Sequence, residues 1–181
     1  MPRIAYADPA SMPEKTRESY DRLPRKLNIF RMWSNAATIF PAGIRYGNAI
    51  LTKQKLSAAR RELVILAVGR IEGGIYEFAQ HIPIALAAGC REDQVSALEH
   101  ARFEDASFDE AEKAMLRLTR EVVLDVKASD AAMEAAKKHF DAQEIVEIVC
   151  TIGFYMTIAR LTETTGIEVD AERIAHFEKI R

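Results

Sequence analysis

Glu77 and His81 are the two residues of this sequence best suited to transferring a proton. They stand four residues apart in a segment predicted to be helical, and residues at that spacing share one face of a helix. A carboxylate beside an imidazole has the ingredients of acid–base catalysis near neutral pH. Tyr76 and Gln80 flank the pair and are suited to hydrogen bonding in the same place. We therefore take Glu77 and His81 as candidate catalytic residues, and Tyr76 and Gln80 as candidate residues of a substrate pocket.

Glu62 is a third candidate catalytic residue, at the start of the preceding predicted helix. Two glycines at 73–74 separate the helices, and an antiparallel hairpin around them would place Glu62 far from Glu77. Spacing alone therefore does not bring Glu62 to the site. Trp33 and Tyr155 lie on other apolar helical segments and are further candidates for the pocket, with ordinary core packing as the alternative interpretation.

Two other interpretations of the Glu–His spacing stay open. Such a pair is often a surface contact worth a few tenths of a kcal/mol. It also resembles half of a metal site, but zinc needs three or four ligands and the other three histidines lie on unrelated polar segments. No P-loop, Rossmann or G-x-S-x-G motif is present. We expect no metal and no other cofactor.

Composition narrows the class of protein. The chain has 181 residues, of which 49% are hydrophobic and 29% charged, with a net charge of −2. No basic cluster suggests nucleic acid as a partner. The N-terminus lacks an apolar signal core, and no run approaches the roughly 20 apolar residues of a membrane span. We expect a cytoplasmic protein with a small-molecule substrate and no membrane partner.

The two cysteines, Cys90 and Cys150, lie far apart and form no C-x-x-C motif. We interpret them as ordinary thiols, with Cys150 in the core because it lies in a long apolar run.

Helix signals dominate the chain, and strand signals are nearly absent. The sequence predicts an all-α fold: one domain over residues 13–181 with a short N-terminal arm over residues 1–12. The predicted helices cover 14–23, 28–33, a segment from 41, 57–71, 75–88, 92–100, a segment beginning near 109, 130–140, 142–165 and a short tail capped by Asp170. The 142–165 helix is apolar nearly all round, which predicts burial on several sides, in the core or against another subunit.

The segment 57–89 resembles the carboxymuconolactone decarboxylase family, which also includes the alkyl hydroperoxidase D proteins. It carries R-E-L-V-I-L-A-V, a glycine break, and then Y-E-F-A-Q-H-I-P-I-A-L-A-A-G. The resemblance implies an all-helical fold of the alkyl hydroperoxidase D type. It also implies a homo-oligomer: a trimer, a hexamer made of two trimers, or a dimer.

In the hydroperoxidase branch of that family, a Glu on one helix precedes C-x-x-C-x-x-x-H on the next. Glu62 and His81 match the acid and the histidine, but the two cysteine positions hold Gly74 and Glu77. Peroxide reduction needs a thiolate, so the resemblance does not carry peroxidase activity to this chain. Two alternatives stay open: a hydroperoxidase-like enzyme that uses Cys90 or Cys150, and a helical ligand-binding protein without catalysis.

The decarboxylase branch needs no cysteine and acts on a carboxylated lactone. The resemblance therefore implies a cofactor-free lyase for a small carboxylated or lactone metabolite. Loss of CO₂ leaves a carbanion or dienolate that must be stabilised and reprotonated. In this hypothesis His81 transfers the proton and Glu77 orients it or holds its charge. Glu62 completes the relay if the fold brings it near.

Overall fold

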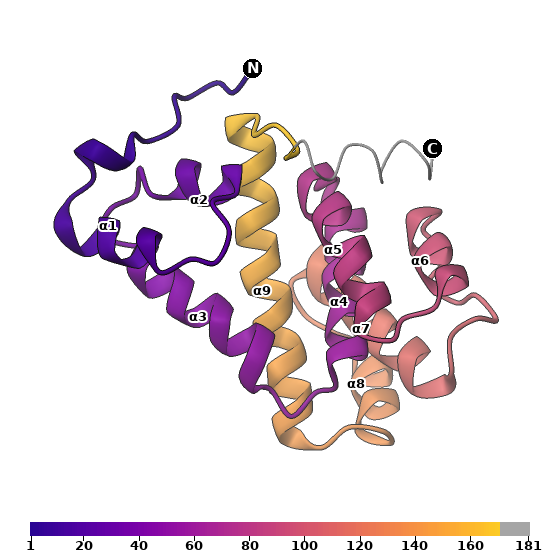
Figure 1. The fold of residues 1–181 in the computed structure, drawn as a ribbon. Coiled ribbons are helices and arrows are strands. Elements are labelled where there is room, and N and C mark those ends of the chain that lie inside the picture. The colour runs from indigo at the N-terminus through magenta and orange to yellow at the C-terminus, as the bar shows by residue number, and fades with distance from the viewer. Residues whose placement is uncertain (171–181) are drawn as a thin grey trace.

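All regular structure in residues 1–170, the residues that the computed structural model describes, is helical (Figure 1). The all-α prediction is therefore confirmed. The elements are η1 (Pro9–Ser11), α1 (Glu14–Asp21), α2 (Asn28–Trp33), α3 (Phe40–Lys53), α4 (Ala58–Glu72), α5 (Ile75–Ala87), α6 (Glu92–Glu99), α7 (Glu110–Asp125), α8 (Asp130–Lys137) and α9 (Ala142–Thr165).

The helix α9 runs through the middle of the fold. In Figure 1, α1, α2 and α3 lie on one side of it, and α4 to α8 lie on the other. It packs against α4, α5 and α7, and also touches α2, α3 and α8. The adjacent α4 is buried without a break from Arg61 to Gly69. These two helices form the core against which α5, with the candidate residues, is held.

Local signals explain where the long helices begin and end. The Ser57 side chain accepts a hydrogen bond from the backbone of α4, and Asp141 forms a capping box at the start of α9. Gly73 and Gly166 end these helices with φ values of 72° and 67°, which a glycine adopts without strain. The short helices end earlier than predicted: α1 stops at Asp21 and α8 at Lys137.

The first residues of the chain lie against α2 and the end of α9. The backbone N–H of Arg3 donates to the carbonyl of Thr165 at 2.7 Å, and that of Ala7 donates to Arg31 at 3.1 Å. The predicted division between an arm and a domain at residue 12 stays a prediction. The predicted tail helix lies outside the described residues.

Length and composition alone would allow α9 to cross a membrane, and it is the one helix of residues 1–170 that passes this test. The core helix of a soluble protein passes the same test, and Ile148, Ile152 and Tyr155 of α9 are buried inside the fold. Another face of α9 leaves Val146 and Val149 exposed. The predicted burial of α9 therefore holds for part of its circumference.

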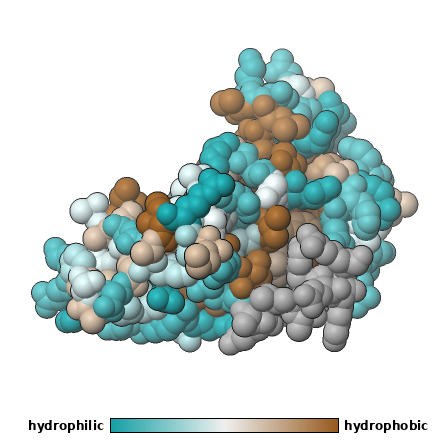
Figure 2. Space-filling model, turned by 90° about the horizontal axis from the view of Figure 1, so that it is seen from above, coloured by the Kyte–Doolittle hydropathy of each residue, from teal (hydrophilic) through white to brown (hydrophobic). Residues whose placement is uncertain are grey.

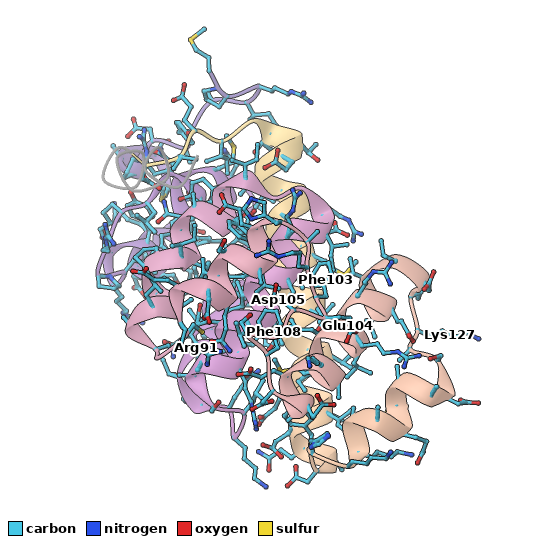
Figure 3. All side chains as sticks on the ribbon, turned by 90° about the vertical axis from the view of Figure 1, so that its right-hand side faces the viewer. Arg91, Phe103, Glu104, Asp105, Phe108 and Lys127 are labelled. Carbon is cyan, nitrogen blue, oxygen red and sulfur yellow. The ribbon has the colours of Figure 1, made fainter. Side chains whose placement is uncertain are left out.

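On the far side of the molecule from α3, the connection between α6 and α7 folds back over the core (Figure 3). Arg91 donates a hydrogen bond to the carbonyl of Ser107, and the carboxylate of Asp105 accepts one from the backbone of Ser107. Phe108 is buried in the main core. These contacts fix a side of the protein that carries none of the candidate residues.

Two glycines let α3 approach two aromatic rings very closely. A Cβ atom at Gly43 would lie 2.3 Å from the Trp33 ring, and one at Gly47 would lie 2.6 Å from the Phe154 ring. Neither distance is compatible with a real side chain. The two rings therefore rest on the backbone of α3.

Replacing Gly47 by Ala should lower the free energy of unfolding by about 1–3 kcal/mol, because the added methyl group must displace the Phe154 ring. Gly153→Ala is the matched control, since no atom lies within 4 Å of a Cβ there. That change should be neutral or raise the stability by up to about 1 kcal/mol through helix propensity. Urea unfolding of both variants measures the difference. Equal destabilisation by the two changes would contradict the close approach.

Candidate active site

Glu62 and His81 meet inside the protein. Nδ1 of His81 lies 2.8 Å from Oε2 of Glu62, and the Glu62 side chain is fully buried. Because α4 and α5 run antiparallel from the turn at 73–74, His81, farther from that turn than Glu77, reaches back toward Glu62. The hairpin geometry thus separates Glu62 from Glu77 and still brings it to His81.

Arg61 supplies the second partner of the Glu62 carboxylate. Its Nε and Nη2 atoms donate to Oε1 at 3.1 and 3.0 Å. Burial by itself would raise the pKa of Glu62, but the hydrogen bonds and charges of His81 and Arg61 outweigh it and hold that pKa below its ordinary value. Glu62 is therefore a carboxylate at neutral pH, and its charge favours a proton on Nδ1 of His81.

Glu77 has a different environment from the one predicted for it. The sequence pairs Glu77 with His81, whereas the hydrogen bond to His81 comes from Glu62. The Glu77 carboxylate accepts hydrogen bonds from Oγ1 of Thr162 on α9, at 2.9 Å to Oε1 and 3.1 Å to Oε2. Burial raises the pKa of Glu77 to about 7. This carboxyl group can therefore hold or release a proton near neutral pH.

Gly74 and Glu77 occupy the positions of the two motif cysteines, and they fit one another. A Cβ atom at Gly74 would lie 2.6 Å from Oε2 of Glu77. The glutamate carboxylate therefore fills the space that a side chain at position 74 would need. The two departures from the motif form one local arrangement.

A cavity of about 480 Å³ opens beside these residues, between α2, α3, α5 and α9. That volume lies within the range of small-molecule sites. Leucine, isoleucine and aromatic side chains make up most of its wall. In the view from above, brown patches of hydrophobic residues interrupt the largely teal surface of an angular molecule (Figure 2). The cavity therefore offers an apolar ligand a place beside a proton-transfer pair.

The sequence-predicted pocket residues all line this cavity. Trp33 comes from α2, Tyr76 and Gln80 come from α5, and Tyr155 comes from α9. Glu77 and His81 line it as well, and the ring of His81 packs edge-on against Tyr155 with the centroids 5.0 Å apart. Glu62 lies behind His81 and is not part of the wall.

Sequence reasoning missed Asp170, which ties the end of the described chain to the cavity wall. Its carboxylate accepts hydrogen bonds from the hydroxyl of Tyr76, from Nε2 of Gln80 and from the backbone N–H of Asn28. The sequence assigned Asp170 to the cap of a tail helix. No local signal predicts these contacts, since their partners lie 90 or more residues away.

One of the two thiols, Cys150, lies in a different environment from the one predicted. Cys90 is the buried cysteine, and its Sγ donates to the carbonyl of Ala59 at 3.3 Å. Burial, helped by the charge of Glu62, raises the pKa of Cys90 to about 12. Cys150, predicted to lie in the core, is partly exposed on α9. Neither thiol lines the cavity.

No group of three or more histidine, cysteine, aspartate or glutamate side chains in residues 1–170 is arranged to hold a metal ion. The side chains that face the cavity are suited to proton transfer and hydrogen bonding.

The model of the carboxymuconolactone decarboxylase family matches residues 39–121, which include both members of the Glu62–His81 pair. This segment belongs to the carboxymuconolactone decarboxylase family. The resemblance predicted from the sequence is confirmed. Among curated proteins, no sequence matches the chain significantly.

Solved structures share the fold of this chain over nearly its whole length. The alkylhydroperoxidase AhpD core of an uncharacterized peroxidase-related protein from Ralstonia eutropha JMP134 superposes with a TM-score of 0.82, at 20% identity over 94% of this chain and 93% of that one. A peroxidase-related protein from Silicibacter sp. TM1040 gives 0.80, at 17% identity over 95% and 93%. The debrominase Bmp8 gives 0.78, at 14% identity over 97% and 96%. These similarities confirm an alkyl hydroperoxidase D-like fold.

Proposed function

We propose that this protein is a cofactor-free acid–base enzyme of the carboxymuconolactone decarboxylase type, acting on a small carboxylated or lactone metabolite. The observation that carries the proposal is the buried Glu62–His81 pair behind the wall of an apolar cavity, with Glu77 beside it. Such a cavity with a few convergent polar groups is the usual setting of an enzyme site.

His81 is the proposed proton-transfer residue. Glu62 engages Nδ1, so Nε2 is the ring nitrogen that serves a substrate in the cavity. When the substrate loses CO₂, the electrons of the broken C–C bond pass into the conjugated carbonyl system as a dienolate. The doubly protonated form of His81 then donates its Nε2 proton to carbon, which leaves the neutral ring with its proton on Nδ1, and a proton from water restores the starting form. The apolar wall favours the first step, because a carboxylate is less stable in a low-dielectric site than in water.

Glu77 is the proposed second proton-transfer group. Its pKa of about 7 leaves a large share of protonated carboxylic acid at neutral pH. A protonated carboxyl group can donate a hydrogen bond to a developing dienolate, whereas a carboxylate would repel it. We therefore replace the predicted role of Glu77, orienting His81, by a direct role toward the substrate.

The thiol alternative receives no support from the site. Neither cysteine lines the cavity, and the raised pKa of Cys90 keeps that thiol protonated and unreactive. The fold does accept ring compounds in a relative: one structure of the debrominase Bmp8 is a complex with 2,3,4-tribromopyrrole. This supports a small cyclic substrate for the present chain.

CO₂ release from carboxymuconolactone tests the proposal. We expect turnover by the wild type and by Cys90→Ser/Cys150→Ser, and a loss of about 10²- to 10⁴-fold in His81→Asn. The double cysteine variant is the matched control for the thiol mechanism. Turnover that survives in His81→Asn, or that disappears with the cysteines, would overturn the assignment. No turnover by the wild type would overturn the proposed substrate and favour a non-catalytic ligand-binding protein.

We also propose that the chain forms a homo-oligomer in the cytoplasm. Val146 and Val149 on α9 are exposed, together with Tyr46 on α3, whose hydroxyl donates to the carbonyl of Cys150. Exposed apolar side chains on two helices that contact each other, such as these on α3 and α9, favour contact with a second copy of the chain. Sedimentation at micromolar concentration should give a mass above that of one chain.

A further inference from the structure

A series of aromatic rings runs along the wall of the cavity to the proton-transfer residues. Trp33 and Phe154 have ring centroids 6.0 Å apart, and Phe154 and Tyr155 have them 5.4 Å apart. Tyr155 in turn meets the ring of His81 edge-on. All four rings line the cavity. Aromatic surfaces of this kind prefer the faces and edges of other flat rings as partners.

The rings of this series are held in place from behind. Trp33 rests on Gly43 and Phe154 on Gly47, both on α3, at distances that leave no space for a Cβ atom. Trp33 also packs edge-on against Phe40, which is fully buried. A wall that does not have to reorganise on binding favours a ligand of matching shape.

The size of the cavity exceeds the needs of a single small ring. A dry protein cavity of about 150 Å³ is enough to hold benzene. The cavity here, at about 480 Å³, is roughly three times as large. It therefore has room for a molecule of about two rings.

The charges at the end of this series disfavour an anionic group there. Glu62 is a carboxylate, and the guanidinium of Arg61 is already bound to it. The arginines of the cavity wall, Arg22 and Arg25, belong to the segment after α1 and are exposed. A permanently anionic group beside His81 would therefore lie close to the Glu62 carboxylate, whereas a neutral hydroxyl, carbonyl or ring N–H would find hydrogen-bonding partners.

We propose that this cavity binds a planar, unsaturated compound of about two rings, with a neutral hydrogen-bonding group directed at His81 and Glu77. The inference rests on the proposed function for the identity of the reacting end, and it adds the shape, size and charge of the substrate. It assigns Trp33 and Phe154 as the residues that determine specificity for flat rings.

Binding of four probes to the full chain tests this proposal by calorimetry. The probes are 2-naphthol, 2-naphthoate with an anionic group, 2-decalol with a saturated and non-planar skeleton, and phenol with one ring. We expect one molecule of 2-naphthol per chain, bound at least about tenfold more tightly than each of the other three. Binding of 2-naphthoate as tight as that of 2-naphthol, or tighter, would overturn the proposed preference for a neutral ligand. The same result with 2-decalol would overturn the preference for a planar ligand, and with phenol the preference for two rings.

Two variants test whether the ligand ring binds against the aromatic wall of the cavity. Trp33→Leu should weaken 2-naphthol binding about three- to tenfold, the worth of one aromatic contact. Asn48→Trp, at an exposed residue that lines the cavity, should block binding without disturbing the core. Leu124→Ala, exposed on α7 and away from the cavity, is the control and should bind as the wild type does. Unchanged affinity in Asn48→Trp would overturn the proposal even if Trp33→Leu fails to fold.

The binding assay needs no turnover, so it separates the two proposals. If 2-naphthol binds as expected and carboxymuconolactone releases no CO₂, the proposed reaction is wrong and the ligand class stands. If CO₂ is released and 2-naphthol does not bind, the ligand class is wrong and the reaction stands.

Discussion

Replacing Glu62 by Gln should lower the free energy of unfolding by about 3 kcal/mol. The Glu62 carboxylate is fully buried and accepts hydrogen bonds from Arg61, whose side chain is only 11% exposed. A neutral amide leaves that guanidinium without its counter-charge, and breaking one side of a buried ion pair typically costs 3–5 kcal/mol. Urea unfolding at pH 7 measures the change.

A double-mutant cycle with Arg61→Gln is the control for this result. In the Arg61→Gln variant the guanidinium charge is already absent. Glu62→Gln should therefore lower the free energy of unfolding by at least about 1 kcal/mol less in that variant than in the wild type. The cycle therefore isolates the Arg61–Glu62 contact from the effect of an altered side chain. Strictly additive losses would show that the two residues do not interact and would contradict the geometry.

Replacing Glu77 by Gln should remove a large pH dependence of stability. Burial raises the pKa of Glu77 to about 7 in the folded protein, from an ordinary value of 4.5. Between these two values the folded state holds more protons than the unfolded state, so the contribution of Glu77 to stability falls as the pH rises. A shift of this size corresponds to about 3 kcal/mol. The wild type should therefore lose about 3 kcal/mol more stability than Glu77→Gln between pH 4.5 and pH 8.

The glutamine variant is a fair comparison, because its amide oxygen can still accept the hydrogen bond of Thr162. Glu110→Gln, which removes an exposed carboxylate on α7, serves as the control. It should follow the wild-type curve within a few tenths of a kcal/mol. Parallel stability curves for the wild type and Glu77→Gln would show that Glu77 does not titrate abnormally.

Local patterns predicted the parts of the fold that depend on neighbouring residues. The helix α9 has the predicted bounds of 142–165, because a glycine with positive φ ends it and Asp141 caps it. The break at 73–74 follows from the sequence as well, because Gly73 ends α4 with a positive φ. The family match also follows from a contiguous segment, since its motif lies on two consecutive helices.

Local sequence patterns could not predict contacts between segments that are far apart in the chain. The distance between Glu62 and His81 depends on how α4 and α5 pack, and spacing suggested Glu77 as the partner of His81 instead. Asp170 reaches Tyr76 across 94 positions of the chain. The exposure of Cys150 depends on which face of α9 meets the rest of the fold, and an almost uniformly apolar helix gives no indication of that face.

The protonation of the His81 ring tests the central claim most directly. Nitrogen NMR of the histidine side chains distinguishes the two neutral forms of the ring. The His81 signal is assigned by its absence in His81→Gln. We expect a proton on Nδ1, held by Glu62, and a change of the signal in Glu62→Gln that is larger than in Glu77→Gln. A neutral ring with its only proton on Nε2 in the wild type, or a signal that responds only to Glu77→Gln, would contradict the Glu62–His81 pair as the proton-transfer unit.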